Sequence, residues 1–149
     1  MNGKKSLNMS VSIIIPTLNE QQNIKRIHAT VIEVFKKTKI EWEIVFVDDK
    51  SNDKTQEMIK SILAENISLI ESPKRKGLGN AISIGWQNAK LDYVLFLDCD
   101  SHVSIQDLKK LINSRKTNSL VIASRYLKKS KVYGAPFIKV FLSKILNQI

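Results

Sequence analysis

A chain of 149 residues, 43% of them hydrophobic and few of them Gly or Pro, is long enough to bury one core, which excludes a disordered chain. Its one cysteine, Cys99, excludes an internal disulfide framework and fits a reducing compartment. The net charge is +10, and all of the excess lies in residues 108–149, which contain ten Lys or Arg and no acid.

The first part of the chain alternates short apolar runs with amphipathic segments. VSIII (11–15) predicts a strand that Pro16 ends, and residues 24–35 predict a helix. EIVFV (43–47) predicts a buried strand, and residues 51–65 a helix that begins with capping residues. The apolar helix faces are expected to contain Ile24, Ile27, Val31, Ile32 and Phe35 in the first helix, and Met58, Ile59, Ile62 and Leu63 in the second.

The same alternation continues to the end of the chain. Strands are predicted over 67–70, 93–97 (YVLFL) and 120–123 (LVIA), and helices over 78–89, 104–116 and after Pro136. Because the strand runs are apolar on both faces, the fold class is α/β: a mostly parallel sheet with helices on both faces. We expect an N-terminal tail over 1–10 and a single domain over 11–149.

Polar side chains follow four of the predicted strands. In open α/β sheets the ligand binds outside the carboxyl ends of the strands, so these side chains predict one shared site. They are Asn19 and Glu20 after the first strand, Asp48 and Asp49 after the second, Asp98 and Asp100 after the fourth, and Arg125 after the fifth.

The stretch YVLFLDCDSH places two like charges directly after an apolar strand. At ~4 Å and an effective dielectric constant of about 20, two carboxylates repel each other by roughly 4 kcal/mol. Residues i and i+2 of an extended chain face the same way, so Asp98 and Asp100 can ligate one divalent cation, for which oxygen ligands favour Mg²⁺ or Mn²⁺. A solvated turn is the alternative. His102 is either a further metal ligand or a surface residue, and Cys99 is expected to pack as a small apolar residue.

The loop KRKGLGNA precedes the predicted helix at 78–89. It contains Lys74, Arg75 and Lys76, followed by Gly77 and Gly79. Glycines allow close approach of the backbone, and a helix N-terminus favours phosphate. We therefore expect this loop to face a phosphate group.

Four segments, taken together, resemble the family 2 glycosyltransferases of the GT-A fold, and more narrowly the dolichol- or polyprenol-phosphate mannose synthases. The segments are SIIIPTLNEQQNI, EIVFVDDKSNDKT, RKGLGNAISIGWQNAKLDYVLFLDCDS and IASRY. The resemblance runs from about Val11 to the C-terminus, in the family's order and spacing. One departure is Leu18, which stands where relatives usually have an aromatic residue.

The resemblance implies transfer of a sugar from a nucleotide-sugar donor, with inversion and with Mg²⁺ or Mn²⁺. By motif, Asp98, Cys99 and Asp100 would lie at the donor diphosphate and metal, with His102 as a further ligand. Arg125 would approach the donor or acceptor phosphate, and Lys139 the acceptor; Asp98, Asp100 and Arg125 are the expected catalytic residues. The nucleotide pocket would be lined by Pro16, Leu18, Glu20, Val47 and Asp49, with Asp48 and Gly77 beside them.

The acceptor is expected to be a polyprenyl or dolichyl phosphate. Such a phosphate is anionic at neutral pH and can attack the sugar without a strong base, whereas a sugar hydroxyl needs a carboxylate base, and none can be assigned. The basic C-terminal stretch and GAPFIKVFLSKIL suit an anionic membrane, which predicts peripheral contact at its cytoplasmic face.

Other interpretations remain open. The donor, expected to be GDP-mannose, could instead be a UDP-sugar used on a lipid or polysaccharide. The chain could also be a catalytically incomplete nucleotide-sugar-binding module, completed by a further C-terminal segment or by a partner. A nucleic-acid partner is disfavoured, because no nucleic-acid-binding motif is present and carboxylates repel a polyanion.

Overall fold

The computed structural model describes residues 10–116 and 119–124, in which helices and strands alternate. The chain forms two compact units, residues 1–110 and residues 111–149, and the sheet lies in the first. The elements are β1 (Val11–Thr17), α1 (Ile24–Phe35), β2 (Trp42–Asp48), α2 (Thr55–Lys60), β3 (Ile67–Glu71), α3 (Leu78–Asn88), β4 (Tyr93–Phe96) and α4 (Ile105–Asn113). No helix in these residues is both long and apolar enough to cross a bilayer.

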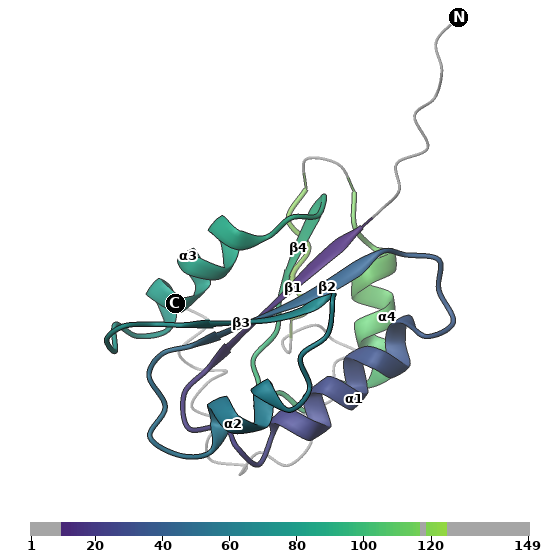
Figure 1. The fold of residues 1–149 in the computed structure, drawn as a ribbon. Helices are drawn as coiled ribbons and strands as arrows, with labels where there is room; N and C mark the ends of the chain where they lie inside the picture. Colours follow the sequence, from purple (N-terminus) through teal and green to yellow (C-terminus); the bar gives the residue numbers. More distant parts are fainter. Residues whose placement is uncertain (1–9, 117–118, 125–149) are drawn as a thin grey trace, which may run out of the picture. The chain divides into compact units, whose positions relative to one another are not determined.

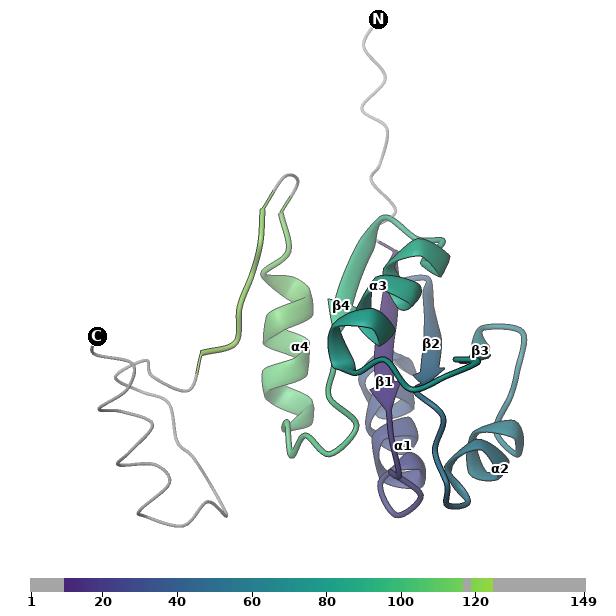
Figure 2. The ribbon, with the colours of Figure 1, turned by 90° about the vertical axis from the view of Figure 1, so that its left-hand side faces the viewer.

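The sheet is parallel, in the order β3-β2-β1-β4 (Figure 1). From β1 the chain adds β2 and β3 on one side and then returns to place β4 on the other side. The strand order therefore reverses between β1 and β4. Figures 1 and 2 show α3 on one face of the sheet and α1 and α2 on the other. The α/β class with helices on both faces is confirmed.

The core follows from the alternation of side chains along the strands. Ile14, Val45 and Val47 pack with Ala81 on the face covered by α3. A Cβ added to Gly85 of α3 would overlap the side chain of Ile14, so a glycine is needed where this helix crosses β1. The opposite face of β1 and β2 is buried as well, which explains why both strands read as continuous apolar runs.

Pro16 does not end β1 as predicted, because the strand continues to Thr17. The Leu97 N–H donates to the Ile14 carbonyl on the β4 side, whereas the Asp49 N–H donates to the Thr17 carbonyl on the β2 side. Pro16, two residues after Ile14, therefore turns its missing N–H toward β4, whose pairing with β1 stops at Ile14. A proline is tolerated there because no ladder bond is lost.

Two predicted helices differ from the observed ones in detail. The helix expected over 51–65 is only α2, because residues 49–54 form a loop bonded to the β1–α1 connection and Ala64 makes a bridge to Ile67. In α1, Val34 is buried and Ile32 is partly exposed, although Ile32 was expected on the buried face.

The strand expected over 120–123 is not formed. Residues 119–124 have no strand pairing, and Leu120 and Ile122 are 85% and 71% exposed. An apolar run becomes a strand only when a neighbouring strand supplies hydrogen bonds, and local sequence does not specify that neighbour. The helix expected after Pro136 lies outside the described residues.

Candidate functional site

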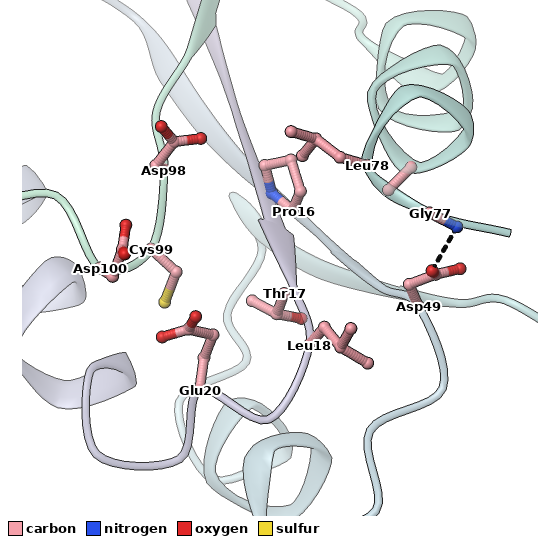
Figure 3. Close-up of a pocket in the computed structure, with 11 residues that line it drawn as sticks. Pro16, Thr17, Leu18, Glu20, Asp49, Gly77, Leu78, Asp98, Cys99 and Asp100 are labelled. Carbon is pink, nitrogen blue, oxygen red and sulfur yellow. Dashed lines mark hydrogen bonds between the residues drawn. The ribbon is translucent and has the colours of Figure 1, made fainter. Parts of the chain in front are cut away.

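A hollow of about 190 Å³ opens at the carboxyl edge of the sheet, where the strand order reverses between β1 and β4 (Figure 3). This is the place where open α/β sheets bind ligands. Residues from the ends of β1, β2 and β4 and from the start of α3 line it. They are Pro16, Thr17, Leu18, Glu20, Asp49, Gly77, Leu78, Ala81, Asp98, Cys99 and Asp100.

The β1 side of the hollow is held by the loop before α2. Asn19 adopts a left-handed conformation, with φ 58°, which asparagine tolerates. Its N–H donates to Ser51 Oγ (2.8 Å), and its side-chain oxygen accepts from the Asn52 N–H (2.8 Å). The Glu20 N–H donates to Thr55 Oγ1 (2.7 Å). The connection after β1 is thus fixed by the connection after β2.

Asp48 lies at the end of β2 but does not line the hollow. It is fully buried, and its carboxylate accepts from Thr17 Oγ1 (3.1 Å), from the N–H and Oγ of Ser51 (2.9 and 2.5 Å), and from Gln56 Nε2 (2.7 Å). Val47, also predicted at the nucleotide, is buried in the core on the α3 face. In this structure Asp48 joins β1, β2 and α2, and Val47 packs the sheet.

Asp49 lines the hollow and holds the basic loop before α3. Its carboxylate accepts from the Lys76 N–H (3.0 and 3.2 Å) and from the Gly77 N–H (2.7 Å; Figure 3). Gly77 has a φ of 88°, which favours glycine and turns its N–H toward the carboxylate. The N–H groups expected to face a phosphate are therefore bonded to Asp49.

The segment after β4 presents two open carboxylates. Asp98 and Asp100 are exposed and alternate with buried Leu97 and Cys99. Asp98 and Asp100 both line the hollow, and that they bind one ligand stays a prediction. The expected extended backbone is not observed, because the Ser101 N–H donates to the Asp98 carbonyl (3.1 Å) and closes a turn. We call residues 98–101 the aspartate turn.

The two carboxylates of the aspartate turn differ from those after β2 in their partners. Among residues 10–116 and 119–124, no hydrogen bond or ion pair to either side chain is found. Within the described residues, the lone pairs of their oxygens are free to bind a ligand.

Cys99 is 3% exposed, as expected of a small packed residue. Burial, together with the charges of Glu20 and Asp100 and against that of Arg26, raises the pKa of its thiol to about 12. A thiol with so high a pKa stays protonated at neutral pH, so Cys99 is a poor nucleophile.

The donor set fits a hard divalent cation only in part. Within the described part of the chain, no three His, Cys, Asp or Glu side chains come together as a metal cluster. The three-residue set with His102 is therefore not assembled, and His102 is exposed and does not line the hollow. Two carboxylates still suit Mg²⁺ or Mn²⁺, because Mg²⁺ commonly takes one or two protein carboxylates and completes its shell with water and substrate phosphates.

The hollow brings together eight of the predicted site residues and adds three that the sequence did not single out. The eight are Pro16, Leu18, Glu20, Asp49, Gly77, Asp98, Cys99 and Asp100; the three are Thr17, Leu78 and Ala81. Thr17 could have been found from its place at the end of β1, and Leu78 and Ala81 from the first turn of α3. Arg125 and Lys139 lie outside the described residues.

Comparison with known proteins identifies the family. The family described as "Glycosyl transferase family 2" matches residues 12–147, nearly the whole chain. The chain belongs to glycosyl transferase family 2.

Two relatives and one solved structure show how far this similarity extends. A dolichol-phosphate mannosyltransferase of Pyrococcus furiosus is 34% identical over 138 residues, covering 91% of this chain and 39% of the relative. A dolichyl-phosphate beta-glucosyltransferase of Trichomonas vaginalis is 33% identical, covering 92% and 45%. The structure of S. aureus TarS residues 1–349 with UDP-GlcNAc is 26% identical, with a TM-score of 0.60, covering 68% of this chain and 29% of that one.

These similarities confirm the resemblance to family 2 and the GT-A fold. The chain spans less than half the length of the two curated relatives. The family match therefore covers nearly all of this chain, whereas this chain corresponds to less than half of each of the two relatives.

Proposed function

We propose that this family 2 protein transfers a sugar, with inversion, from a nucleotide-sugar donor to a polyprenyl or dolichyl phosphate. One observation carries the proposal: the open carboxylates of Asp98 and Asp100 line the same hollow as Asp49, at the strand-order reversal. The names of the two relatives, both enzymes of dolichyl phosphate, support the choice of acceptor.

The two walls of the hollow suggest how the donor lies. Figure 3 shows Asp98, Asp100 and Glu20 on one side of β1, and Asp49, Gly77 and Leu78 on the other. We assign the nucleoside to the side of Leu18 and Asp49, where apolar and polar groups alternate. The diphosphate belongs beside the aspartate turn, since two bare carboxylates tolerate a diphosphate only with a cation between them.

Asp98 and Asp100 are the residues that would hold Mg²⁺ or Mn²⁺. When bound, the cation supplies positive charge that stabilises the departing nucleoside diphosphate. The chain's own part is to orient the donor and exclude water from its sugar, using the ends of β1, β2 and β4. Attack by the acceptor phosphate on the face of the sugar opposite the leaving nucleoside diphosphate inverts the anomeric carbon. We assign to Arg125 a contact with a donor or acceptor phosphate.

A phosphate acceptor suits the groups present. Its oxygen is already ionised near neutral pH, so the attack needs positioning rather than proton removal. The basic excess of residues 108–149, including Lys139, supports a binding place for the lipid phosphate at an anionic membrane surface. We therefore propose peripheral action at the cytoplasmic face of the membrane.

GDP-mannose is our first choice of donor, because a mannosyltransferase is among the most similar relatives. A UDP-sugar is the second, since a glucosyltransferase is nearly as similar and TarS was solved with UDP-GlcNAc. Calorimetry of the 149-residue chain with GDP and UDP, each in Mn²⁺ and in EDTA, distinguishes the two. We expect one nucleotide to bind much more tightly in Mn²⁺. Equal affinity of both nucleotides in Mn²⁺ and in EDTA would refute the metal-assisted site.

Transfer itself needs a separate assay. Radiolabelled GDP-mannose or UDP-glucose is incubated with polyprenyl phosphate in detergent, with Asp100→Asn as the inactive control. Lipid-linked product formed by the wild type, but not by Asp100→Asn, supports the proposed reaction. Tight, Mn²⁺-dependent nucleotide binding without product would instead favour a binding module that needs a further segment or partner.

A further inference from the structure

Arg26 of α1 hydrogen-bonds the aspartate turn. Arg26 Nη1 donates to the Ser101 carbonyl (2.6 Å), and Arg26 Nη2 donates to the Cys99 carbonyl (3.1 Å). A turn leaves such carbonyls without strand partners, and an unmade bond is costly when the group is partly buried. One guanidinium thus satisfies two carbonyls on the turn that carries Asp98 and Asp100.

The anchor continues to the end of β1. Arg26 Nη2 also donates to Asn23 Oδ1 (3.3 Å), and Asn23 Nδ2 donates to Glu20 Oε2 (2.6 Å). Glu20 and the aspartate turn both line the hollow, although they follow different strands. Arg26 and Asn23 therefore connect the segment after β1 to the aspartate turn after β4.

We infer that Arg26 is a positioning residue, which sets the separation of the Asp98 and Asp100 carboxylates for a divalent cation. This inference rests on the proposed function. Arginine suits the role because its planar fork reaches two acceptors at once and is always charged, whereas a lysine ammonium is a point charge on a flexible stem. Arg26 itself touches neither the cation nor the donor.

The neighbouring residue provides a matched control. Lys25 precedes Arg26 on α1 and is exposed, so Lys25→Gln removes the same charge from the same helix turn. Arg26→Gln removes the charge and the bonds to the turn. Arg26→Lys keeps the charge but replaces the planar fork with an ammonium on a flexible stem.

The test is a Mn²⁺ titration of the 149-residue chain with GDP or UDP, whichever the wild type binds more tightly, followed by calorimetry. We expect Arg26→Gln to raise the Mn²⁺ concentration at half-saturation about tenfold, and Arg26→Lys to recover part of the loss. Lys25→Gln should stay within about twofold of the wild type. In EDTA, where the turn has no cation to bind, nucleotide affinity should stay within about twofold for all variants.

A tenfold loss restricted to Mn²⁺ cannot come from a merely structural role, which would weaken binding in EDTA as well. Equal Mn²⁺ titrations of Arg26→Gln and Lys25→Gln would overturn the inference, as would an equal loss with and without metal. If Arg26→Gln does not melt cooperatively, the test rests on Arg26→Lys. A Mn²⁺ half-saturation of Arg26→Lys equal to that of the wild type then overturns the inference. A wild type that binds nucleotide without any effect of Mn²⁺ refutes the metal-assisted function as well, so the two failures are distinguishable.

Discussion

The carboxyl ends of β2 and β4 both present acids, yet the structure treats them differently. Asp48, after β2, is buried and accepts four hydrogen bonds, whereas Asp98 and Asp100, after β4, are exposed and have no protein donor among the described residues. Asp49 is intermediate, since it lines the hollow and also accepts from the loop before α3. The difference shows that the hydrogen-bond donors around a carboxylate, rather than its position after a strand, decide whether it stabilises the fold or stays available to a ligand.

The largest effect is expected at Cys99, between the two open carboxylates. Because burial raises the pKa of the Cys99 thiol from 9.0 to about 12, its thiolate fraction at pH 8 is about a thousandfold lower than in the unfolded chain. Iodoacetamide in metal-free buffer should therefore modify the native chain at least about a thousandfold more slowly than the urea-unfolded chain. A native rate within tenfold of the unfolded one would mean that the aspartate turn is not packed as described.

Asp48→Ala tests the carboxylate that accepts hydrogen bonds from the protein. The substitution leaves Thr17 Oγ1 and Gln56 Nε2 without their acceptor in a buried place, so we expect the free energy of unfolding to fall by about 3 kcal/mol. Urea denaturation measures this loss. Asp98→Ala, with no donor to abandon, should change stability by less than about 0.5 kcal/mol. Equal losses in the two variants would abolish the distinction.

Asp100→Asn tests the open side. We expect Mn²⁺-dependent binding of GDP or UDP to weaken about a hundredfold, because a neutral amide is a poor ligand for a hard cation, while the urea midpoint stays at its wild-type value. Glu65→Gln, at an exposed acid outside the hollow, serves as control and should bind as the wild type does. Undiminished binding by Asp100→Asn would remove Asp100 from the site.

Asp49→Asn sharpens the intermediate case. The new amide turns an N–H₂ toward the Lys76 or Gly77 N–H, so the loop before α3 loses an acceptor. We expect nucleotide affinity to fall about tenfold both in Mn²⁺ and in EDTA, since we propose that Asp49 lies at the nucleoside. Calorimetry under the two conditions measures it. A loss confined to Mn²⁺ would assign Asp49 to the metal side instead.

The smallest effect concerns pH and the loop that holds β1. Burial raises the pKa of Asp53, but hydrogen bonds from Thr55 and from the Gln21 N–H outweigh it, so the pKa lies below its usual 3.8. A lowered pKa stabilises the fold above the unfolded-state value, and this stability is lost as pH falls through the folded-state value. Between pH 6 and 3, the unfolding free energy of Asp53→Asn should therefore decline less than that of the wild type. Parallel declines would contradict the assignment.

Much of the fold could be predicted because it depends on local pattern. The apolar runs indicated β1 to β4, and the 3.6-residue spacing indicated α1 and α3 with nearly their observed ends. Errors arose where a partner distant in sequence decided the outcome. Strand β1 continues through Pro16 because its pairing with β4 stops at Ile14. Helix α2 is short because a hydrogen bond between Asn19 and Ser51 holds the preceding residues in a loop. The run 120–123 lacks a strand partner.

The candidate site shows the same division between local pattern and distant partners. The position of acids after β2 and β4 is a property of the sequence, and so is the family, since the motifs stand in order along the chain. The hollow also includes Thr17, Leu78 and Ala81, which carry no distinctive chemistry; only their places at the end of β1 and in the first turn of α3 could have indicated them. Asp48 looked equivalent to Asp49 in sequence, but it is buried and hydrogen-bonds residues of β1 and α2.

By itself the sequence determined the alternation of elements, the parallel sheet and the edge at which acids gather, because these follow from residue type and spacing over a few positions. Only the tertiary structure decided which acid is filled and which is open. Asp48 accepts from Ser51 and Gln56 nearby in the chain, but other donors are far away along it. Thr17 lies 31 residues from Asp48, and Lys76 lies 27 residues from Asp49. Arg26 reaches carbonyls 73 and 75 residues away. Such partners meet only when the sheet has formed, because hydrogen bonds act over about 3 Å and carry no mark in the local sequence.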